Sequence, residues 1–164
     1  MTTVENKKTS FTRKADANDI DVIADIEQKC FHGATAYSKR QLTYLILKAN
    51  STSIVESNSY AIRGFIIVLY RKGTQIGYLE TLDVDPAFQS QGIGLKLLLA
   101  AEEEIKSRGL KFSQLEVSEG NEAAVGLYQK AGYKQKKRLV GFYKFKHHGT
   151  YVAVRMIKTL EAVQ

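Results

Sequence analysis

The sequence predicts a single mixed α/β domain, with one mostly antiparallel sheet of about seven strands flanked by about four helices. Two observations predict it. Amphipathic segments of helical periodicity alternate with short runs rich in β-branched and aromatic residues, and turn-forming residues separate them. A chain of 164 residues, with 44% hydrophobic and 25% charged residues, has the composition of one globular domain. We expect residues 1–10 to be a flexible N-terminus and residues 11–164 to form the domain.

The first half of the chain predicts one strand, two helices and then three strands. The first helix begins after the N-cap Asn18 and ends near Cys30, because apolar residues recur between them at steps of three and four. After Asn50, runs rich in β-branched and aromatic residues replace the helical pattern. The expected elements are a strand at 11–14, helices at 18–30 and 38–49, and strands at 52–56, 61–70 and 75–84.

The second half of the chain predicts two helices and three strands. A long helix is expected between Gly92 and Arg108, and Gly109 terminates it. Asn121 is the expected N-cap of the last helix, which ends at Ala131. The remaining strands are expected at 112–117, 133–143 and 151–157.

Cysteine content and hydropathy exclude several classes of protein. The single cysteine, Cys30, cannot form an intrachain disulfide, which excludes the disulfide-rich secreted class and suits a small core residue. No apolar run approaches the roughly 18 residues that cross a bilayer. Residues 1–14 contain no apolar stretch typical of a secretion signal. We therefore expect a cytoplasmic protein without a membrane partner.

The charge balance favours an anionic partner. Lysine and arginine total 24 against 17 acidic residues, which gives a formal net charge of +7. Nucleic acid, an anionic membrane and a phosphorylated cofactor would each suit this charge. The basic region of Lys134–Arg138, with Lys144 and Lys146, is more typical of a solvated edge strand than of a nucleic-acid surface, because no nucleic-acid-binding motif accompanies it.

The most informative segment is a strand that runs through a glycine-containing loop into a helix. The first N–H groups of a helix have no partner inside it and carry partial positive charge, so they bind phosphate. A Walker loop would need Gly-Lys-Ser/Thr, and a dinucleotide fingerprint would need a third glycine where Leu97 stands. The pattern that remains is Gln89-x-x-Gly92-x-Gly94.

The residues around this loop resemble motif A of the GNAT superfamily of N-acetyltransferases. The matching pattern is Leu82-x-Val84-x-Pro86-x-x-Gln89-x-x-Gly92-x-Gly94. A second stretch is similar to the family's next motif through Leu115-Glu116-Val117, Asn121, Ala124, Leu127-Tyr128 and Gly132-Tyr133. The resemblance covers roughly residues 11–160. It implies the GNAT fold and the transfer of an acetyl group from acetyl-CoA to a primary amine, and the pattern is closest to the N-terminal, ribosomal-protein-type acetyltransferases.

The resemblance also implies which residues bind acetyl-CoA. The loop amides of Gln91, Gly92, Ile93 and Gly94 would bind its pyrophosphate, and Gln89 stands where members carry Arg or Gln. The backbone of Leu82, Asp83 and Val84 would pair with the pantetheine arm, with one strand amide polarising the thioester carbonyl. Because Gln91 is neutral where members often carry a basic residue, Lys96 would supply the cation or else be a solvated surface lysine. Asn121 would cap its helix, contact the CoA arm, or do both.

Two residues of the second motif are candidates for proton transfer. Tyr128 falls where many members place a tyrosine near the CoA sulfur, so it would protonate the leaving thiolate or else be a core aromatic. Glu116 matches the general base of the N-terminal acetyltransferases, acting directly or through water. A carboxylate paired across strands with a lysine is the alternative for Glu116.

Two further candidates lie on the strand before the loop. Tyr78 matches a catalytic tyrosine in one N-terminal acetyltransferase branch, and Glu80 has the chemistry of a base. Strand alternation predicts that Tyr78, Glu80, Leu82 and Val84 share one face. We expect a direct attack of the amine in a ternary complex, with no covalent enzyme intermediate.

The acceptor amine is less defined by the sequence. Gly141-Phe142-Tyr143 resembles the region in which tyrosines frame the peptide in N-terminal acetyltransferases, but Thr150-Tyr151-Val152 stands where those enzymes often carry an acidic pair. A protein or peptide N-terminus, a lysine, a polyamine and a small amine are all open, as is a non-catalytic CoA-binding module. His147 and His148 are expected in a solvated turn, and no metal site is expected. We expect a monomer or homodimer.

Overall fold

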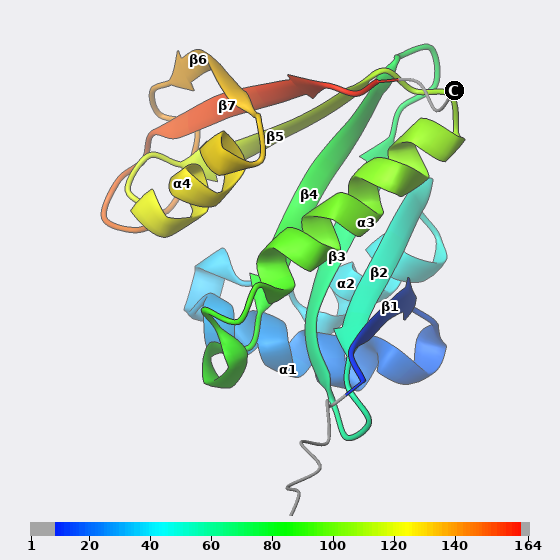
Figure 1. The fold of residues 1–164 in the computed structure, drawn as a ribbon. Coiled ribbons are helices and arrows are strands. Elements are labelled where there is room, and N and C mark those ends of the chain that lie inside the picture. Colours follow the sequence, from blue (N-terminus) through cyan, green and yellow to red (C-terminus); the bar gives the residue numbers. More distant parts are fainter. Residues whose placement is uncertain (1–8, 162–164) are drawn as a thin grey trace, which may run out of the picture.

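The strands form one seven-stranded sheet with the order β1-β2-β3-β4-β5-β7-β6 in the computed structural model, which describes residues 9–161 (Figure 1). Only β4 and β5 are parallel; all other neighbours are antiparallel. The strands are β1 (Phe11–Lys14), β2 (Ser51–Ser57), β3 (Ile62–Tyr70), β4 (Ile76–Val84), β5 (Phe112–Ser118), β6 (Lys134–Leu139) and β7 (Ala153–Thr159). The helices are α1 (Ile20–Cys30), α2 (Lys39–Leu47), α3 (Ile93–Ser107) and α4 (Glu122–Lys130). The predicted fold class is confirmed.

The sheet separates two apolar cores, because alternate side chains of the central strand β3 point to opposite faces. Ile66, Val68 and Tyr70 join a cluster with α3 and α4, whereas Phe65 and Ile67 join one with α1 and α2. All five side chains are buried, which explains why β3 is apolar at nearly every position. Figure 1 shows α3 crossing one face of the sheet, with α1 and α2 behind the other.

The start of α1 differs from the sequence prediction. Asn18 is not the N-cap, because a short 3-10 turn (Ala17–Asp19) precedes α1. Asp16 caps this turn by accepting the amide of Asn18, and the side chain of Asp19 accepts the amide of Asp16 in return. This reciprocal pair is a capping box, so the helical segment starts two residues earlier than expected.

The segment between the last two strands also differs from the prediction. β6 ends at Leu139 and β7 begins at Ala153, whereas strands were expected over 133–143 and 151–157. The intervening chain turns instead, because His148 and Gly149 have positive φ angles of 51° and 78°. They form a two-residue turn closed by hydrogen bonds between His147 and Thr150, as positive φ at both central positions allows.

The surface beyond this segment is basic. β6 lies at the edge of the sheet with its residues almost all exposed, which confirms the prediction of a solvated edge strand. Arg138 of β6 donates to Glu119 at 2.7 Å. Within residues 9–161, no helix has the length and apolar character that crossing a membrane requires.

A β-bulge in β4 separates β4 from β5. Along the β3–β4 ladder, Ile67 pairs with Thr81 and Val68 pairs with Leu79, so Glu80 has no partner on β3. The parallel pairing of β4 with β5 stops at the same place, with Leu79 opposite Leu115. Beyond that point the two strands diverge (Figure 1).

The bulge also changes which face each side chain occupies. Leu82 and Val84 pack against the α3 cluster, while Asp83 is buried among groups of α1. The prediction that Tyr78, Glu80, Leu82 and Val84 share a face is therefore wrong. The extra residue puts Leu79 and Leu82, which are three positions apart, on the same face of the sheet, so the regular alternation of side chains is shifted by one residue at the bulge.

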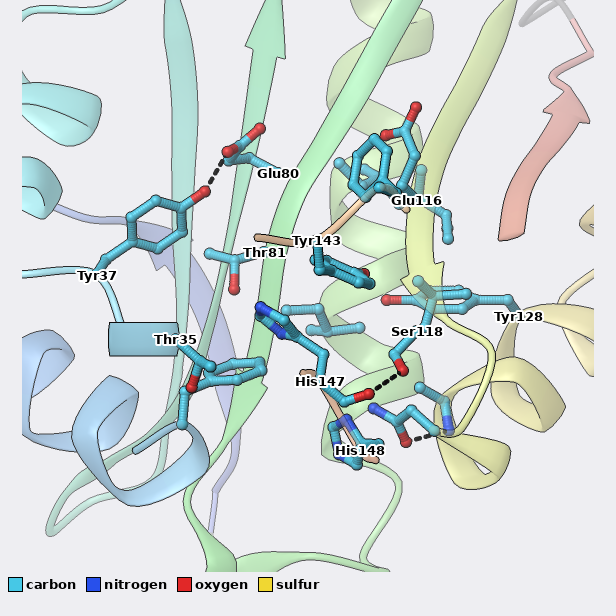
Figure 2. Close-up of a pocket in the computed structure, with 18 of the residues that line it drawn as sticks. Thr35, Tyr37, Glu80, Thr81, Glu116, Ser118, Tyr128, Tyr143, His147 and His148 are labelled. Carbon is cyan, nitrogen blue, oxygen red and sulfur yellow. Dashed lines mark hydrogen bonds between the residues drawn. The ribbon is translucent and has the colours of Figure 1, made fainter. Parts of the chain in front are cut away.

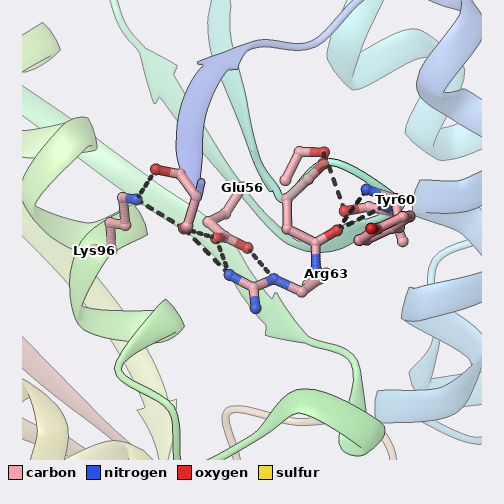
Figure 3. A network of polar contacts seen from close by, with 8 residues as sticks. Glu56, Tyr60, Arg63 and Lys96 are labelled. Carbon is pink, nitrogen blue, oxygen red and sulfur yellow. Dashed lines mark hydrogen bonds and ion pairs between the residues drawn. The ribbon is translucent and has the colours of Figure 1, made fainter. Parts of the chain in front are cut away.

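The N-terminal end of β1 is fixed by a polar network (Figure 3). Glu56 of β2 is fully buried and accepts from Arg63 Nε of β3 at 2.9 Å and from the Ser10 hydroxyl. Lys96 of α3 donates to the Ser10 carbonyl at 2.7 Å. Burial raises the pKa of Glu56, but the hydrogen bonds from Arg63 and Ser10 outweigh it and hold that pKa below its usual value. Ser10, the last residue of the expected flexible N-terminus (1–10), is therefore held in place by hydrogen bonds. Residues 1–8 of that segment lie outside the described residues.

We expect Glu56→Gln to lower the free energy of unfolding by about 3 kcal/mol, because it leaves the largely buried Arg63 guanidinium without a counter-charge. Urea denaturation measures this change. Glu119→Gln, which breaks an exposed pair with Arg138, should leave the unfolding midpoint unchanged. Replacing Glu56 and Arg63 together by leucine should cost less than Glu56→Leu alone; an equal or larger cost would contradict the assignment of a coupled buried pair.

Candidate active site

Two adjoining cavities open where β4 and β5 diverge. The first, here called the loop cavity, is about 550 Å³ and lies between the end of β4 and the starts of α3 and α4. This volume is within the range of small-molecule sites. The second, called the inner cavity, lies between β4, β5, the α1–α2 connection and the β6–β7 connection (Figure 2). Both are lined by Phe31, Leu82, Asn121, Ala124, Tyr128 and His148, so they adjoin, and together they are called the cleft.

The start of α3 presents unpartnered backbone N–H groups to the loop cavity. Gly92 adopts the left-handed conformation with φ 78°, which a residue with a Cβ would adopt only with strain. As a glycine, it provides no side chain to cap the first amides of the helix. The first amide that bonds back to Gly92 is that of Lys96, at 3.1 Å. The amides of Ile93 and Gly94 therefore have no partner within the helix, and both residues line the cavity.

Most of the candidate cofactor residues line the loop cavity. They are Leu82, Asp83, Val84, Gln89, Gly92, Ile93, Gly94, Asn121 and Tyr128. Gln89 donates to the Val84 carbonyl at 3.2 Å, and Asn121 caps α4 by accepting the Ala124 amide at 3.2 Å, as predicted.

Two candidate cofactor residues lie elsewhere. Gln91 is exposed and does not line the loop cavity. For Lys96 the sequence left open a cation at the loop or a solvated surface lysine; its ammonium instead donates to Ser10 beside the buried Glu56 (Figure 3). The reason is helical geometry, because Lys96 lies on a face of α3 that contacts the β1 side of the sheet rather than the loop.

The carboxylates of the inner cavity are already hydrogen-bonded. Glu116 of β5 accepts from Arg155 Nε of β7 at 2.8 Å, so it has a cross-strand partner, though an arginine rather than a lysine. Glu80 accepts from the Tyr37 hydroxyl. Tyr78 does not line the cavity; its ring lies 4.7 Å from the guanidinium carbon of Arg71.

Tyr128 lies where the two cavities join. Its ring is buried and packs edge-on against Tyr133, with 5.7 Å between ring centroids. Figure 2 shows its hydroxyl directed into the inner cavity. Burial, with smaller contributions from Asp83 and Tyr143, raises the pKa of Tyr128 well above its usual value. The phenol is therefore protonated and can donate a hydrogen bond into the cleft.

Several cavity residues were missed by sequence reasoning because they lie on irregular connections. Tyr37 follows α1, and His147 and His148 lie between β6 and β7; Tyr143, which the sequence placed in the peptide-framing region, lines the same cavity. The His147 ring stacks on Tyr143, with 3.9 Å between ring centroids, and faces Phe31 at 6.3 Å. The two histidines lie in a turn, as expected, but they line the cleft rather than facing only solvent. The feature of the sequence that indicates this turn is Gly149, because a glycine readily adopts the positive φ that the turn requires.

A family model described as "Acetyltransferase (GNAT) family" matches residues 20–133, which form both cavities together with the β6–β7 connection. The chain belongs to the GNAT family of acetyltransferases. It is 31% identical over 110 residues to N-alpha-acetyltransferase 30 of Schizosaccharomyces pombe, which covers 65% of this chain and 73% of that protein. Other curated relatives match over 57 to 61 residues, which span only 17–39% of their own length.

Solved structures share the GNAT fold over nearly the whole chain. The ribosomal-protein-S18-alanine N-acetyltransferase from Escherichia coli superposes with a TM-score of 0.83 at 21% identity, covering 95% of this chain and 97% of that one. A putative acetyltransferase from Salmonella typhimurium, solved with acetyl-CoA, has a TM-score of 0.75 at 19% identity and covers 93% and 94%. At sequence identities of 19–21%, these structural similarities establish the fold of this GNAT protein and not its substrate.

A buried pair of carboxyl groups joins β4 to α1 behind the cleft. Glu27 and Asp83 are each 1% exposed, and Oε2 of Glu27 and Oδ2 of Asp83 have no hydrogen-bond partner among the described residues. The other oxygens accept from the Tyr37 amide at 3.0 Å and from the Thr81 hydroxyl at 2.7 Å. Burial and the neighbouring Glu27 raise the pKa of Asp83 well above its usual value, so Asp83 keeps its proton to a higher pH than an exposed carboxyl group does.

We expect the free energy of unfolding to fall as the pH rises, and we expect the Asp83→Asn variant to lack this dependence. The folded state holds the Asp83 proton more tightly than the unfolded state, so this stabilisation is complete below the unfolded pKa of about 4 and is lost as the pH rises through the folded pKa. Denaturation at a series of pH values between about 5 and about 9 measures it. The exposed Asp25→Asn change is the control, and parallel profiles for wild type and Asp83→Asn would contradict the raised pKa of Asp83.

Proposed function

We propose that this chain transfers an acetyl group from acetyl-CoA to the primary amine of a protein or peptide N-terminus. The amine would attack the thioester directly in a ternary complex with acetyl-CoA and a single domain of residues 11–164. The observation that carries the proposal is the pair of adjoining cavities. One presents the first amides of α3, which have no partner within the helix, and the other is lined by aromatic and carboxylate side chains. Tyr128 lies at the junction of the two cavities. The relative N-alpha-acetyltransferase 30 supports an N-terminal acceptor by its name.

The residues of the loop cavity fit a long anionic cosubstrate such as acetyl-CoA, which would supply the thioester. The amides at Gly92, Ile93 and Gly94 suit a diphosphate because they are unpartnered and carry the positive end of the helix dipole. Beyond the bulge, the edge of β4 at Leu82–Val84 has no β5 partner, so its peptide groups can pair with the amides of a pantetheine arm. The Salmonella typhimurium structure of the same fold supports this cosubstrate.

The inner cavity suits an amine that carries positive charge before it reacts. Glu80 and Glu116 line it and would attract the ammonium of the acceptor, while Tyr37 and Tyr143 would frame the chain that follows. A free α-amine, with a pKa near 8, costs about 1.4 kcal/mol to deprotonate at pH 7, whereas a lysine side chain costs about 4.6 kcal/mol. This difference favours an N-terminal acceptor over a lysine.

The local chemistry favours direct transfer over a covalent enzyme intermediate. Cys30 lines the loop cavity and donates to the Val84 carbonyl at 3.2 Å. Burial, together with the nearby Asp83, raises the pKa of the Cys30 thiol to about 12, so it is not a nucleophile at neutral pH. Tyr128 is the group that would protonate the departing sulfur. The cytoplasmic compartment and the monomeric or homodimeric state stay predictions.

We expect Tyr128→Phe to lower kcat by roughly 100-fold, because it removes the proton donor at the junction. The dissociation constant for acetyl-CoA should change much less than kcat, because the variant keeps the aromatic ring that lines the loop cavity and loses a single hydroxyl. Release of CoA thiol with an N-terminal peptide mixture measures turnover, and calorimetry measures binding. Tyr44→Phe, on the exposed face of α2, is the matched control. Absence of acetylated peptides with the wild-type protein would contradict the proposed function.

A further inference from the structure

The acceptor side of the cleft holds an imidazole that has no role in the scheme above. Each carboxylate of the inner cavity already accepts a hydrogen bond: Glu116 from Arg155, Glu80 from Tyr37, and Glu27 from the Tyr37 amide. Glu27 also lies beside the buried carboxyl group of Asp83. A base that removes a proton from an amine needs an available lone pair beside that amine. Each of these hydrogen bonds engages one carboxylate oxygen, whereas the ring nitrogens of His147, which also lines this cavity, take part in no hydrogen bond with another of the residues 9–161.

The position of His147 is fixed by its main chain. Its amide donates to the Thr150 carbonyl at 2.9 Å, and its carbonyl accepts from the Ser118 hydroxyl at 2.6 Å. His148 next to it takes the positive φ that closes the turn. These hydrogen bonds hold the start of the turn against the end of β5. They fix the main chain of His147 and, with it, the direction in which its side chain leaves the backbone.

The ring of His147 is held in the cavity by aromatic contacts alone. It stacks on Tyr143 and faces Phe31 of the α1–α2 connection, and Figure 2 shows it directed into the cavity. Neither ring nitrogen makes a hydrogen bond to another of the residues 9–161. The ring is thus oriented by packing while its nitrogen lone pair is left for a substrate or water.

The surroundings keep this imidazole neutral. The titratable groups that line the same cavity are Glu27, Tyr37, Glu80, Glu116, Tyr128, Tyr143 and His148. Burial, and to a smaller extent the neighbouring His148, lower the pKa of His147 below its ordinary value. Of the carboxylates that line the same cavity, Glu116 is paired with Arg155 and Glu80 accepts from Tyr37. At pH 7 the ring is therefore an acceptor of protons.

We propose that His147 is the general base that takes the proton from the attacking amine, an inference that rests on the proposed function. The acceptor ammonium first loses one proton to solvent, and the free amine nitrogen then bonds to the carbonyl carbon of the thioester, while the carbon–sulfur bond breaks with its electron pair leaving on sulfur. The proton that nitrogen loses on this attack passes to the His147 imidazole and then to solvent. The sulfur receives its proton from the Tyr128 hydroxyl, which solvent restores.

The test uses the full chain, acetyl-CoA and a peptide with a free N-terminus. His147→Gln should lower kcat/KM by about 100-fold and leave acetyl-CoA affinity unchanged. In the wild type, kcat/KM should rise with pH through an inflection below about 6.5, and this inflection should vanish in the variant. His32→Gln is the control, because His32 is exposed and lies outside both cavities.

A second variant separates a chemical role from a structural one. His147→Ala should regain activity when imidazole is added to the assay, whereas Tyr128→Phe should not respond to it. The proposal is overturned if His147→Gln keeps kcat/KM within about threefold of wild type. It is also overturned if Glu116→Gln, rather than His147→Gln, removes the inflection, or if imidazole restores nothing. A wild-type protein that binds acetyl-CoA but acetylates no peptide would instead refute the proposed function, and this inference with it.

Discussion

The unpaired residue Glu80 forces β4 away from β5, and the cleft exists because of that separation. Strands in a continuous sheet pair along their whole length, so their peptide groups would not be available to a ligand. Here the pairing ends at Leu79 and Leu115, and the edges of both strands beyond it line cavities. The same bulge brings Leu82 and Val84 to the α3 side and turns Asp83 towards α1. One inserted residue thus determines both the opening and the side chains around it.

The rest of the fold holds the two sides of this opening in place. On one side, β3 buries both of its faces and fixes β4 between two cores. On the other side, β5 is paired along its length with β7, and Glu116 and Arg155 join the two strands across the ladder. The buried carboxyl pair of Glu27 and Asp83 ties α1 to β4, so the wall that carries Tyr37 follows the position of the strand.

Features encoded by local sequence were predictable, whereas those made by distant contacts were not. The glycine loop before α3 and the Asn121 cap of α4 follow from backbone rules that act within a few residues. The bulge at Glu80 could not be predicted, because residues 76–84 alternate acceptably as a regular strand and only pairing with β3 reveals the extra residue. The contacts of Lys96, Tyr37 and His147 could not be predicted for the same reason, since their partners lie on other elements.

A crystal structure of the protein with CoA tests this account most directly. We expect the diphosphate on the amides of Gly92 and Gly94, with the pantetheine arm hydrogen-bonded to the main chain of Leu82–Val84 in the gap between β4 and β5. CoA bound elsewhere on the molecule, or β4 and β5 paired beyond Leu79 and Leu115 with no gap between them, would contradict it.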